Sequence, residues 1–296
     1  MKSGVALAVV LGAAVAAQAQ YSSTFEPPVY TGSATGTPLT NGFGGPAGQD
    51  GWYNPVSGSV DFQVHTYAGN PLGFPSNPNG GTQFIGALGS ASPNIIGRGQ
   101  HAVDFSAGGT WTASWDVAGG FIGTAPAFDN LGSFSLQPSS GTGFANYFQQ
   151  IMQWGTNTPN PVQYNINYGS FTAAGAAAGG AGILFLSPGP AWQNIPVNHW
   201  IHEEATFDFT SNQILSVTIQ NLTLGTPAVT ADVSAMGWYL AGGANNIQAR
   251  PFPTDIRTFT GNNQNATGWD NIAIVPAPGA LALLGLGGLL AGRRRR

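Results

Sequence analysis

The chain has 296 residues, of which 42% are hydrophobic and only 7% charged; this excludes a disordered chain, because disorder goes with low hydrophobicity and many charges. Residues 21–275 contain three arginines, no lysine and all 12 acidic residues, a net charge of about −9 that excludes a nucleic-acid-binding surface, which needs clustered Lys and Arg. Cysteine is absent, which excludes disulfides, thiolate metal sites and a cysteine nucleophile.

The N-terminus has the pattern of a secretory signal peptide. Lys2 is followed by an apolar run at residues 5–16 and then by the small-x-small sequence Ala17-Gln18-Ala19. This order matches the charged, hydrophobic and cleavage regions of such peptides. Residues 1–19 are therefore predicted to be a signal-peptide helix that is removed before Gln20. The alternative is a buried helix, but the polar, Pro- and Gly-rich residues that follow offer it no pattern to pack against.

Short strand-like runs separated by Gly- and Pro-rich breaks fill the middle of the chain. Alternating or β-branched and aromatic residues indicate strands at residues 59–67, 110–117, 132–136, 163–168, 183–186 and 214–221. Only residues 146–154 favour a helix. Because no linker divides the region, residues 20–275 are predicted to form one all-β domain, a sandwich of two antiparallel sheets.

The clearest local unit lies at residues 199–220. Two alternating runs flank the short polar turn Ser211-Asn212-Gln213, which predicts a β-hairpin. One face of its first strand carries Glu203 among apolar residues, and the other face carries His202 and Glu204. This Trp-led pair of strands resembles those of concanavalin-like and jelly-roll domains. The resemblance implies a jelly-roll sandwich.

The two ends of the domain also resemble jelly-roll carbohydrate-binding modules. The domain opens with Thr24-Phe25-Glu26 and closes with Gly268-Trp269-Asp270-Asn271, and the resemblance implies that the first and last strands are adjacent. In those modules carboxylates at this place often hold a structural Ca²⁺, an ion that takes six to eight oxygen ligands. Glu26 and Asp270 are therefore predicted to be calcium ligands. The alternative is a solvated Glu and an Asp that caps a turn.

The C-terminus ends in an apolar run and a cluster of arginines. Pro276-Ala277-Pro278 leads into apolar residues that continue to Gly292. As a helix, this stretch of about 17 residues would be about 25 Å long, against a hydrocarbon core of about 30 Å. Arginine is costly inside a membrane, so the terminal cluster is expected to stay on the cytoplasmic side. The domain would then be held outside.

This tail resembles the PEP-CTERM sorting signal over residues 275–296. The resemblance implies a short transmembrane helix in the inner membrane and cleavage near the prolines by an exosortase-type sorting protease. Ala277 occupies the position of the usual Glu, a departure that bears on cleavage more than on insertion. The alternative is an ordinary C-terminal anchor. An exported protein is expected, membrane-anchored before sorting and then at the cell surface or in the extracellular matrix. The sorting segment is 276–296, with the motif residues Pro276, Ala277, Pro278, Arg293, Arg294, Arg295 and Arg296.

Glu203 is the one candidate catalytic residue. A buried, unpaired carboxylate is costly, and a raised pKa would suit a general acid. Glycosidases need two carboxylates about 5–9.5 Å apart, and neither position 201 nor 205 is acidic. A partner would come from another strand, with Asp104 and Asp116 as candidates. The alternative is a glutamate whose hydrogen bonds are satisfied or which lies at an edge.

Some aromatic residues beside Gly- and Pro-rich loops are candidates for stacking on sugar rings. Trp192, Trp238 and Tyr239 are predicted to bind ligand in this way, whereas most other tryptophans are expected in the core. With no paired catalytic constellation, we expect a non-catalytic surface or matrix protein that is structural or binds extracellular polysaccharide. The alternative is a glycoside hydrolase or polysaccharide lyase of concanavalin-like fold, for which Glu203 would be essential.

Overall fold

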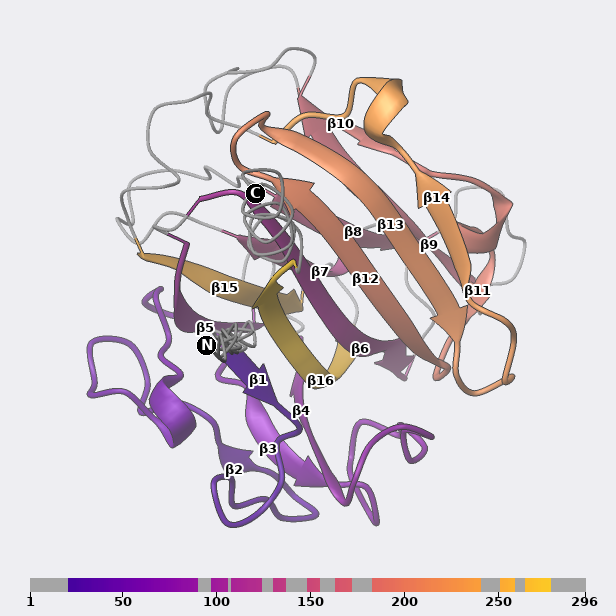
Figure 1. Ribbon diagram of the computed structural model, residues 1–296. Helices are drawn as coiled ribbons and strands as arrows, with labels where there is room; N and C mark the ends of the chain where they lie inside the picture. The colour runs from indigo at the N-terminus through magenta and orange to yellow at the C-terminus, as the bar shows by residue number, and fades with distance from the viewer. Residues whose placement is uncertain are drawn as a thin grey trace, which may run out of the picture.

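The computed structural model describes residues 21–89, 97–105, 108–123, 130–136, 148–154, 163–171, 183–240, 251–258 and 264–277. The strands of these residues form two sheets that lie face to face (Figure 1). Neighbouring strands within each sheet run antiparallel. The predicted all-β fold with two antiparallel sheets is therefore confirmed.

The front sheet has nine strands in the order β14-β13-β12-β6-β16-β4-β3-β2, and β1 pairs with β16. The two longest strands, β6 and β16, have 13 residues each and lie side by side near its middle. Its strands are β1 (Tyr21–Ser23), β2 (Thr37–Pro38), β3 (Gln63–Thr66), β4 (Gln83–Leu88), β6 (Thr110–Ile122), β12 (Trp200–Asp208), β13 (Gln213–Asn221), β14 (Val229–Asp232) and β16 (Gln264–Pro276).

The back sheet has seven strands in the order β10-β9-β8-β7-β15-β5, and β11 pairs with β9. Its strands are β5 (Gly97–Asp104), β7 (Asn130–Leu136), β8 (Phe148–Trp154), β9 (Gln163–Phe171), β10 (Ile183–Leu186), β11 (Ile195–Pro196) and β15 (Pro251–Thr258). Short 3₁₀ helices lie in the connections of the described chain, namely η1 (Gln49–Gly51), η2 (Pro190–Trp192) and η3 (Ser234–Met236).

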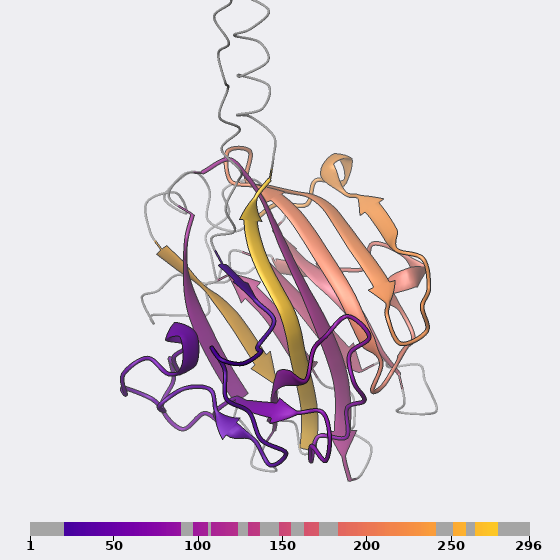
Figure 2. The ribbon, with the colours of Figure 1, turned by 60° about the horizontal axis from the view of Figure 1, so that its bottom comes forward.

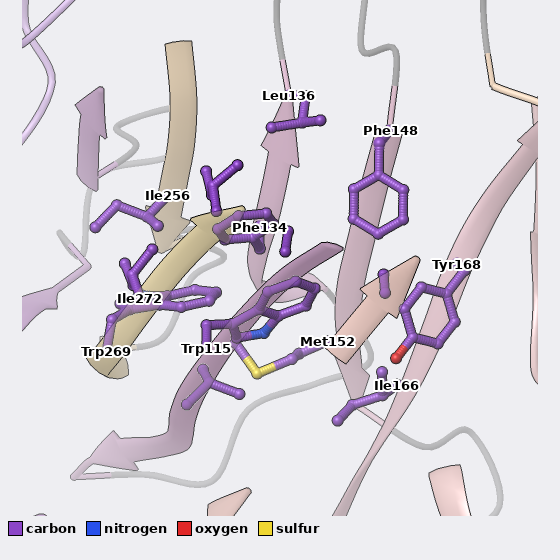
Figure 3. Packing of buried hydrophobic residues seen from close by; sticks show 14 of the residues in the cluster. Trp115, Phe134, Leu136, Phe148, Met152, Ile166, Tyr168, Ile256, Trp269 and Ile272 are labelled. Atoms are coloured by element: carbon purple, nitrogen blue, oxygen red, sulfur yellow. The ribbon is translucent and has the colours of Figure 1, made fainter. Parts of the chain in front are cut away.

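The main core lies between the two sheets and is rich in aromatic side chains (Figure 3). Trp115 of the front sheet stacks on Phe134 of the back sheet, with ring centroids 4.0 Å apart and an interplanar angle of 8°. Trp269 lies 6.3 Å from the same phenylalanine ring. These rings are fully buried, and because each aromatic side chain buries roughly 150–250 Å², their contacts hold the two sheets together.

The hairpin of β12 and β13 shows how alternation places side chains on two faces. Burial alternates from Ile201 to Asp208, with apolar residues and Glu203 toward the core. The strands pair antiparallel through a turn at residues 209–212. In that turn Asn212 has φ 57°, a left-handed conformation that asparagine tolerates better than most residues. The predicted hairpin is confirmed.

The prediction of a helix at residues 146–154 is wrong, because strand β8 occupies Phe148–Trp154. β8 lies between β7 and β9 in the back sheet. Both of its faces are largely buried, including Gln149 and Gln150. A strand with two buried faces loses the alternation that would identify it, and glutamine and methionine are good helix formers by intrinsic propensity.

The first and last strands are adjacent, as the jelly-roll resemblance implies. Tyr21 of β1 lies opposite Ile274 of β16, and Ser23 lies opposite Ile272. β1 ends before the segment Thr24-Phe25-Glu26 that was expected to open the domain. Phe25 has φ 56°, which turns the chain out of the sheet.

One loop covers part of the outer face of the front sheet. This segment, here termed the cover loop (residues 67–82), connects β3 to β4 and lies within the purple N-terminal region gathered at one end of the sheets (Figure 2). Its Leu72 and Phe74 form a second apolar cluster with Phe84 of β4 and Trp200 of β12. The outer face is therefore divided into a covered part and an open part.

The last described residues remain attached to the sheet. Pro276 of β16 pairs with Trp111 of β6, and the N–H of Ala277 donates a hydrogen bond to the carbonyl of Thr110 at 2.9 Å. The predicted signal peptide and the tail from Pro278 onward lie outside the described residues. In the part of the chain that is described, no helix is long and apolar enough to cross a membrane. The domain boundaries and both targeting segments stay predictions.

Candidate functional site

Glu203 faces the main core and is completely buried. Its carboxylate accepts hydrogen bonds from the Tyr168 hydroxyl at 2.8 Å and from Gln150 Nε2 at 2.9 Å. A longer bond of 3.4 Å comes from Trp115 Nε1. Because Tyr168 and Gln150 belong to the back sheet, this carboxyl group connects the two sheets through polar contacts.

Burial determines the protonation of Glu203. Loss of hydration raises its pKa to about 8, although the hydrogen bonds that it accepts act in the opposite direction. The carboxylates predicted to pair with it do not: Asp116 lies on the opposite face of β6, and Asp104 is exposed at the end of β5. Neither candidate partner therefore lies beside Glu203, which is a sealed carboxyl that a polymer in solvent does not reach.

The predicted sugar-stacking tryptophans lie in the core. Trp192 and Trp238 are only 2% and 4% exposed. The Trp192 indole donates a hydrogen bond to the Tyr168 hydroxyl at 3.2 Å, and Trp238 lies 6.3 Å from the same tyrosine ring. The prediction that these indoles form surface platforms is therefore wrong, because the loops that carry them turn the rings inward. Tyr239 is half-buried, and its backbone N–H donates to Ser170 Oγ at 3.2 Å.

The two predicted calcium ligands, Glu26 and Asp270, accept hydrogen bonds from separate sets of donor groups. Both carboxylate oxygens of Glu26 accept hydrogen bonds, at 2.7–2.8 Å, from the backbone N–H groups of Thr82 and Gln83 and from the Thr82 hydroxyl. Asp270 accepts from other groups. Among the described residues, no three His, Asp or Glu side chains are grouped to hold a metal. The calcium site stays a prediction that thermal unfolding with and without a chelator tests, and an unchanged midpoint would contradict it.

Two buried carboxylates lie directly opposite each other on the outer face of the front sheet. Asp116 of β6 pairs in register with Asp270 of β16, and they are 1% and 0% exposed. The Asn77 side-chain amide, from the cover loop, donates to both, at 2.8 Å and 3.2 Å. Tyr67 donates its hydroxyl to Asp270 at 2.8 Å. Asn271 donates its side-chain amide to Asp116 at 2.7 Å and its backbone N–H to Asp270 at 2.8 Å.

His202 connects this arrangement to solvent. Its Nδ1 lies 2.6 Å from Asp116 Oδ1, and 29% of its side chain is exposed. The hydrogen bond to Asp116 raises the pKa of His202, and burial opposes that shift. Burial raises the pKa of Asp270 to about 7, and the negative charge of Asp116 adds to the effect. We term this group the carboxylate cluster; it comprises Tyr67, Asn77, Asp116, His202, Asp270 and Asn271.

The open part of the outer face is polar. Residues on β6, β12, β13 and β14 that alternate with core residues point outward and are partly or fully exposed. Cross-strand pairing arranges them in rows, so that Glu204, for example, lies between Ser114 and Thr218. We term this surface the polar floor; it comprises Thr112, Ser114, Glu204, Thr206, Ser216, Thr218, Gln220 and Thr230. His202 lies in the next row, between Asp116 and Gln220.

Sequence reasoning identified some of these residues but not their grouping. Alternation places His202 and Glu204 on the face of the hairpin opposite Glu203, and the jelly-roll resemblance singles out Asp270 as a calcium ligand. Asn77 carried no signal, since asparagine in a Pro- and Gly-rich loop is ordinary turn chemistry. The hydrogen bond from Asn77 to Asp270 joins residues 193 positions apart, a contact that only the sheet register reveals.

The comparisons with known proteins give remote structural similarities. No family model matches the chain, and no curated protein matches it. Among solved structures, the chain is similar to an alginate lyase from Pseudomonas aeruginosa, at 8% identity over 65% of this chain and 82% of that chain, with a TM-score of 0.41. It is similar to basic winged bean lectin at 13% identity, with 74% and 93% of the two chains covered and a TM-score of 0.38.

A third similar structure is the catalytic domain of a GH131 β-glucanase from Podospora anserina. The identity is 9%, with 75% of this chain and 80% of that chain covered and a TM-score of 0.38. At such identities and scores, what those proteins bind or cleave does not transfer to this chain.

Proposed function

We propose that this protein is an exported, non-catalytic surface or matrix protein that binds neutral polysaccharide on the polar floor. The observation that carries the proposal is the arrangement of the floor itself. Its hydroxyl, amide and carboxylate groups project from neighbouring strands of a rigid sheet and remain accessible to solvent. Sugars present dense hydroxyl groups, and such groups form hydrogen bonds with Ser, Thr, Gln and Glu side chains.

Adjacent floor residues already meet each other at hydrogen-bonding distance. The hydroxyl oxygens of Thr112 and Thr206 lie 3.2 Å apart, and those of Thr218 and Thr230 lie 2.9 Å apart. A threonine hydroxyl has one donor and two acceptor positions, so each of these groups retains capacity for a ligand. The pairs hold the hydroxyls in place, which lowers the entropy lost when a glycan binds.

Charge favours a neutral glycan over an acidic one. The region from residue 21 to residue 275 has a net charge of about −9 and no lysine. The charged residues on the polar floor and in its rows, Glu204 and Asp232, are both acidic. Polymers of uronic acids or sulfated sugars would be repelled by this field. Binding to a neutral polymer would change little with salt, since no ion pairs are formed.

The position of Glu203 supports a binding role over a hydrolase that would use this residue. Its carboxyl group is sealed between the sheets, and among the described residues the acidic partner that retaining or inverting hydrolysis needs is not beside it. The jelly-roll type of sandwich belongs to the same proposal and is supported by the pairing of β1 with β16.

Export is supported by the sequence alone. Residues 1–19 have the order of regions found in signal peptides, and residues 276–296 resemble the PEP-CTERM tail. We infer that the protein passes through the inner membrane, meets an exosortase-type protease and ends at the cell surface or in the matrix.

Affinity electrophoresis of the purified protein tests the binding proposal. Gels would contain dextran, xyloglucan or galactomannan as neutral polymers, and alginate or polygalacturonate as acidic ones. We expect retardation by at least one neutral polymer at both low and high salt. Retardation by acidic polymers alone, or by no polymer, would contradict the proposal.

A further inference from the structure

The cover loop rests on a strip of the front sheet that has almost no side chains. Gly86 of β4, Gly268 of β16 and Gly120 of β6 lie on neighbouring strands, and Gly268 pairs with Gly86. A Cβ atom at Gly268 would lie 3.1 Å from side-chain atoms of both Phe74 and Trp200. Glycine at this place therefore allows the aromatic side chain of the cover loop to approach the sheet.

Aromatic rings flank this glycine strip (Gly86, Gly120 and Gly268). Phe84 and Trp200 have ring centroids 5.8 Å apart and are fully buried beneath the loop. Phe74 lies 6.1 Å from each of these rings. The Trp200 indole donates a hydrogen bond to the carbonyl of Pro75 at 2.7 Å. Loop side chains thus occupy a strip of glycines bordered by Phe84 and Trp200, whose rings meet edge to face at 79°.

The carboxylate cluster fastens the cover loop to the sheet. Tyr67 and Asn77 are its members from the loop, and their donors reach Asp116 and Asp270 on β6 and β16. These bonds hold the loop against both strands, and burial opposes the ionisation of Asp270 while the loop is closed. The surface next to this attachment is the polar floor, since His202 lies in the row beside it.

We propose that the cover loop is a lid that competes with a neutral glycan for the glycine strip, and that the carboxylate cluster is its latch. This inference rests on the proposed function, because the glycan would extend from the polar floor onto the strip. Opening the loop exposes Trp200 and Phe84 beside the polar floor. Glycan reaches the strip only in molecules whose loop is open. The apparent affinity is therefore the intrinsic affinity multiplied by the small fraction of open molecules.

The latch is sensitive to pH with a defined sign. Asp270 faces the Tyr67 hydroxyl from the loop and the Asp116 carboxylate from β6. His202, from β12, faces Asp116, and the charges of Glu203 and Glu204 also act on it. The pKa of Asp270 is raised to about 7 in the closed state. Asp270 therefore binds a proton while the loop is closed and releases it when the loop opens. The opening constant should rise up to about tenfold per pH unit between about pH 4 and 7 and then level off.

Matched asparagine variants of the full-length protein test the lid. Asn77→Ala removes the amide shared by the two carboxylates, whereas Asn79→Ala changes an exposed loop residue whose backbone contact to Asn271 is kept. We expect Asn77→Ala to speed hydrogen exchange in residues 67–82 at least tenfold and to tighten binding of xyloglucan, dextran or galactomannan by a similar factor. Asn79→Ala should behave as the wild type. Tyr67→Phe is the milder second variant if Asn77→Ala does not fold.

The outcomes separate the lid from the binding function. If the wild type binds glycan and the loop opens in Asn77→Ala without any gain in affinity, the lid is overturned and the function stands. If no variant binds a neutral polymer, both are overturned. A second experiment measures hydrogen exchange of the cover loop between pH 5 and 7 in the wild type and in Asp270→Asn, with rates corrected for the intrinsic pH dependence of exchange. The corrected rate should rise with pH in the wild type but not in Asp270→Asn. An equal rise in both proteins would overturn the latch.

Discussion

Glu203 is a single residue whose environment controls how stability depends on pH. Its pKa is raised from 4.5 to about 8 by burial. A carboxyl with a raised pKa contributes stability that is complete below pH 4.5 and is lost as pH rises through about 8. We predict that the free energy of unfolding falls by roughly 3–5 kcal/mol from this group between pH 4.5 and 8.5. Denaturant unfolding at several pH values measures this fall.

The matched control for Glu203 is its neighbour on the same strand. Glu203→Gln keeps the shape and removes the ionisation, so most of the pH-dependent loss of stability should disappear. Glu204→Gln changes a partly exposed residue on the opposite face and should leave the slope unchanged. If Glu203→Gln keeps the slope of the wild type, the assignment of the raised pKa to this carboxyl is wrong.

At the residue level, the sequence predicted which face of a strand a side chain occupies better than it predicted the direction of aromatic side chains in loops. The alternation around Glu203 assigned its face correctly because antiparallel strands with one solvated face have a period of two. Trp192 and Trp238 lie in or after short 3₁₀ segments, where no period relates position to direction. Their inward orientation depends on Tyr168, from a distant strand, and so was not predictable.

Among the elements, β16 has the strictest steric requirement next to the cover loop. Gly268 leaves room for Phe74, Trp200 and Phe84, each within 3.1–3.2 Å of a Cβ built there. We predict that Gly268→Val lowers the free energy of unfolding by about 1–3 kcal/mol through overpacking. Ala273→Val, on a partly exposed position of the same strand, should change it by less than about 0.5 kcal/mol. Chemical denaturation compares the two, and equal effects would contradict tight packing at Gly268.

Some strands could be predicted from their own sequence, and others could not. The β12–β13 hairpin was predictable because its two strands are local, alternate strictly and share a short polar turn. β8 was misread as a helix because both of its faces are buried in the back sheet, so neither alternation nor propensity indicated a strand. The carboxylate cluster needed the register of β6 against β16, which includes a β-bulge between Asp270 and Ala273. A bulge of this kind has no reliable local sequence signal.

For the whole molecule, the proposed localisation rests on the sequence patterns at the two ends of the chain. We predict that full-length protein fractionates with the membrane and that deletion of residues 278–296 releases the domain to the exterior. The deletion keeps Pro276 and Ala277, which are attached to β6, so the fold should be preserved. Cell fractionation with an antibody measures this. Intact 296-residue protein in the cytoplasm would contradict export.

The polar floor is proposed to bind neutral glycan. The most direct measurement is the equilibrium affinity of Thr206→Val/Thr218→Val, which removes two floor hydroxyls while nearly preserving volume. It is compared with the wild type and with Thr31→Val, an exposed threonine outside the floor. With about 0.5–1.5 kcal/mol for each hydrogen bond lost, the double variant should bind the neutral polymer about tenfold more weakly and Thr31→Val should not differ from wild type. Unchanged affinity in the double variant would contradict the assignment of the floor as the binding surface.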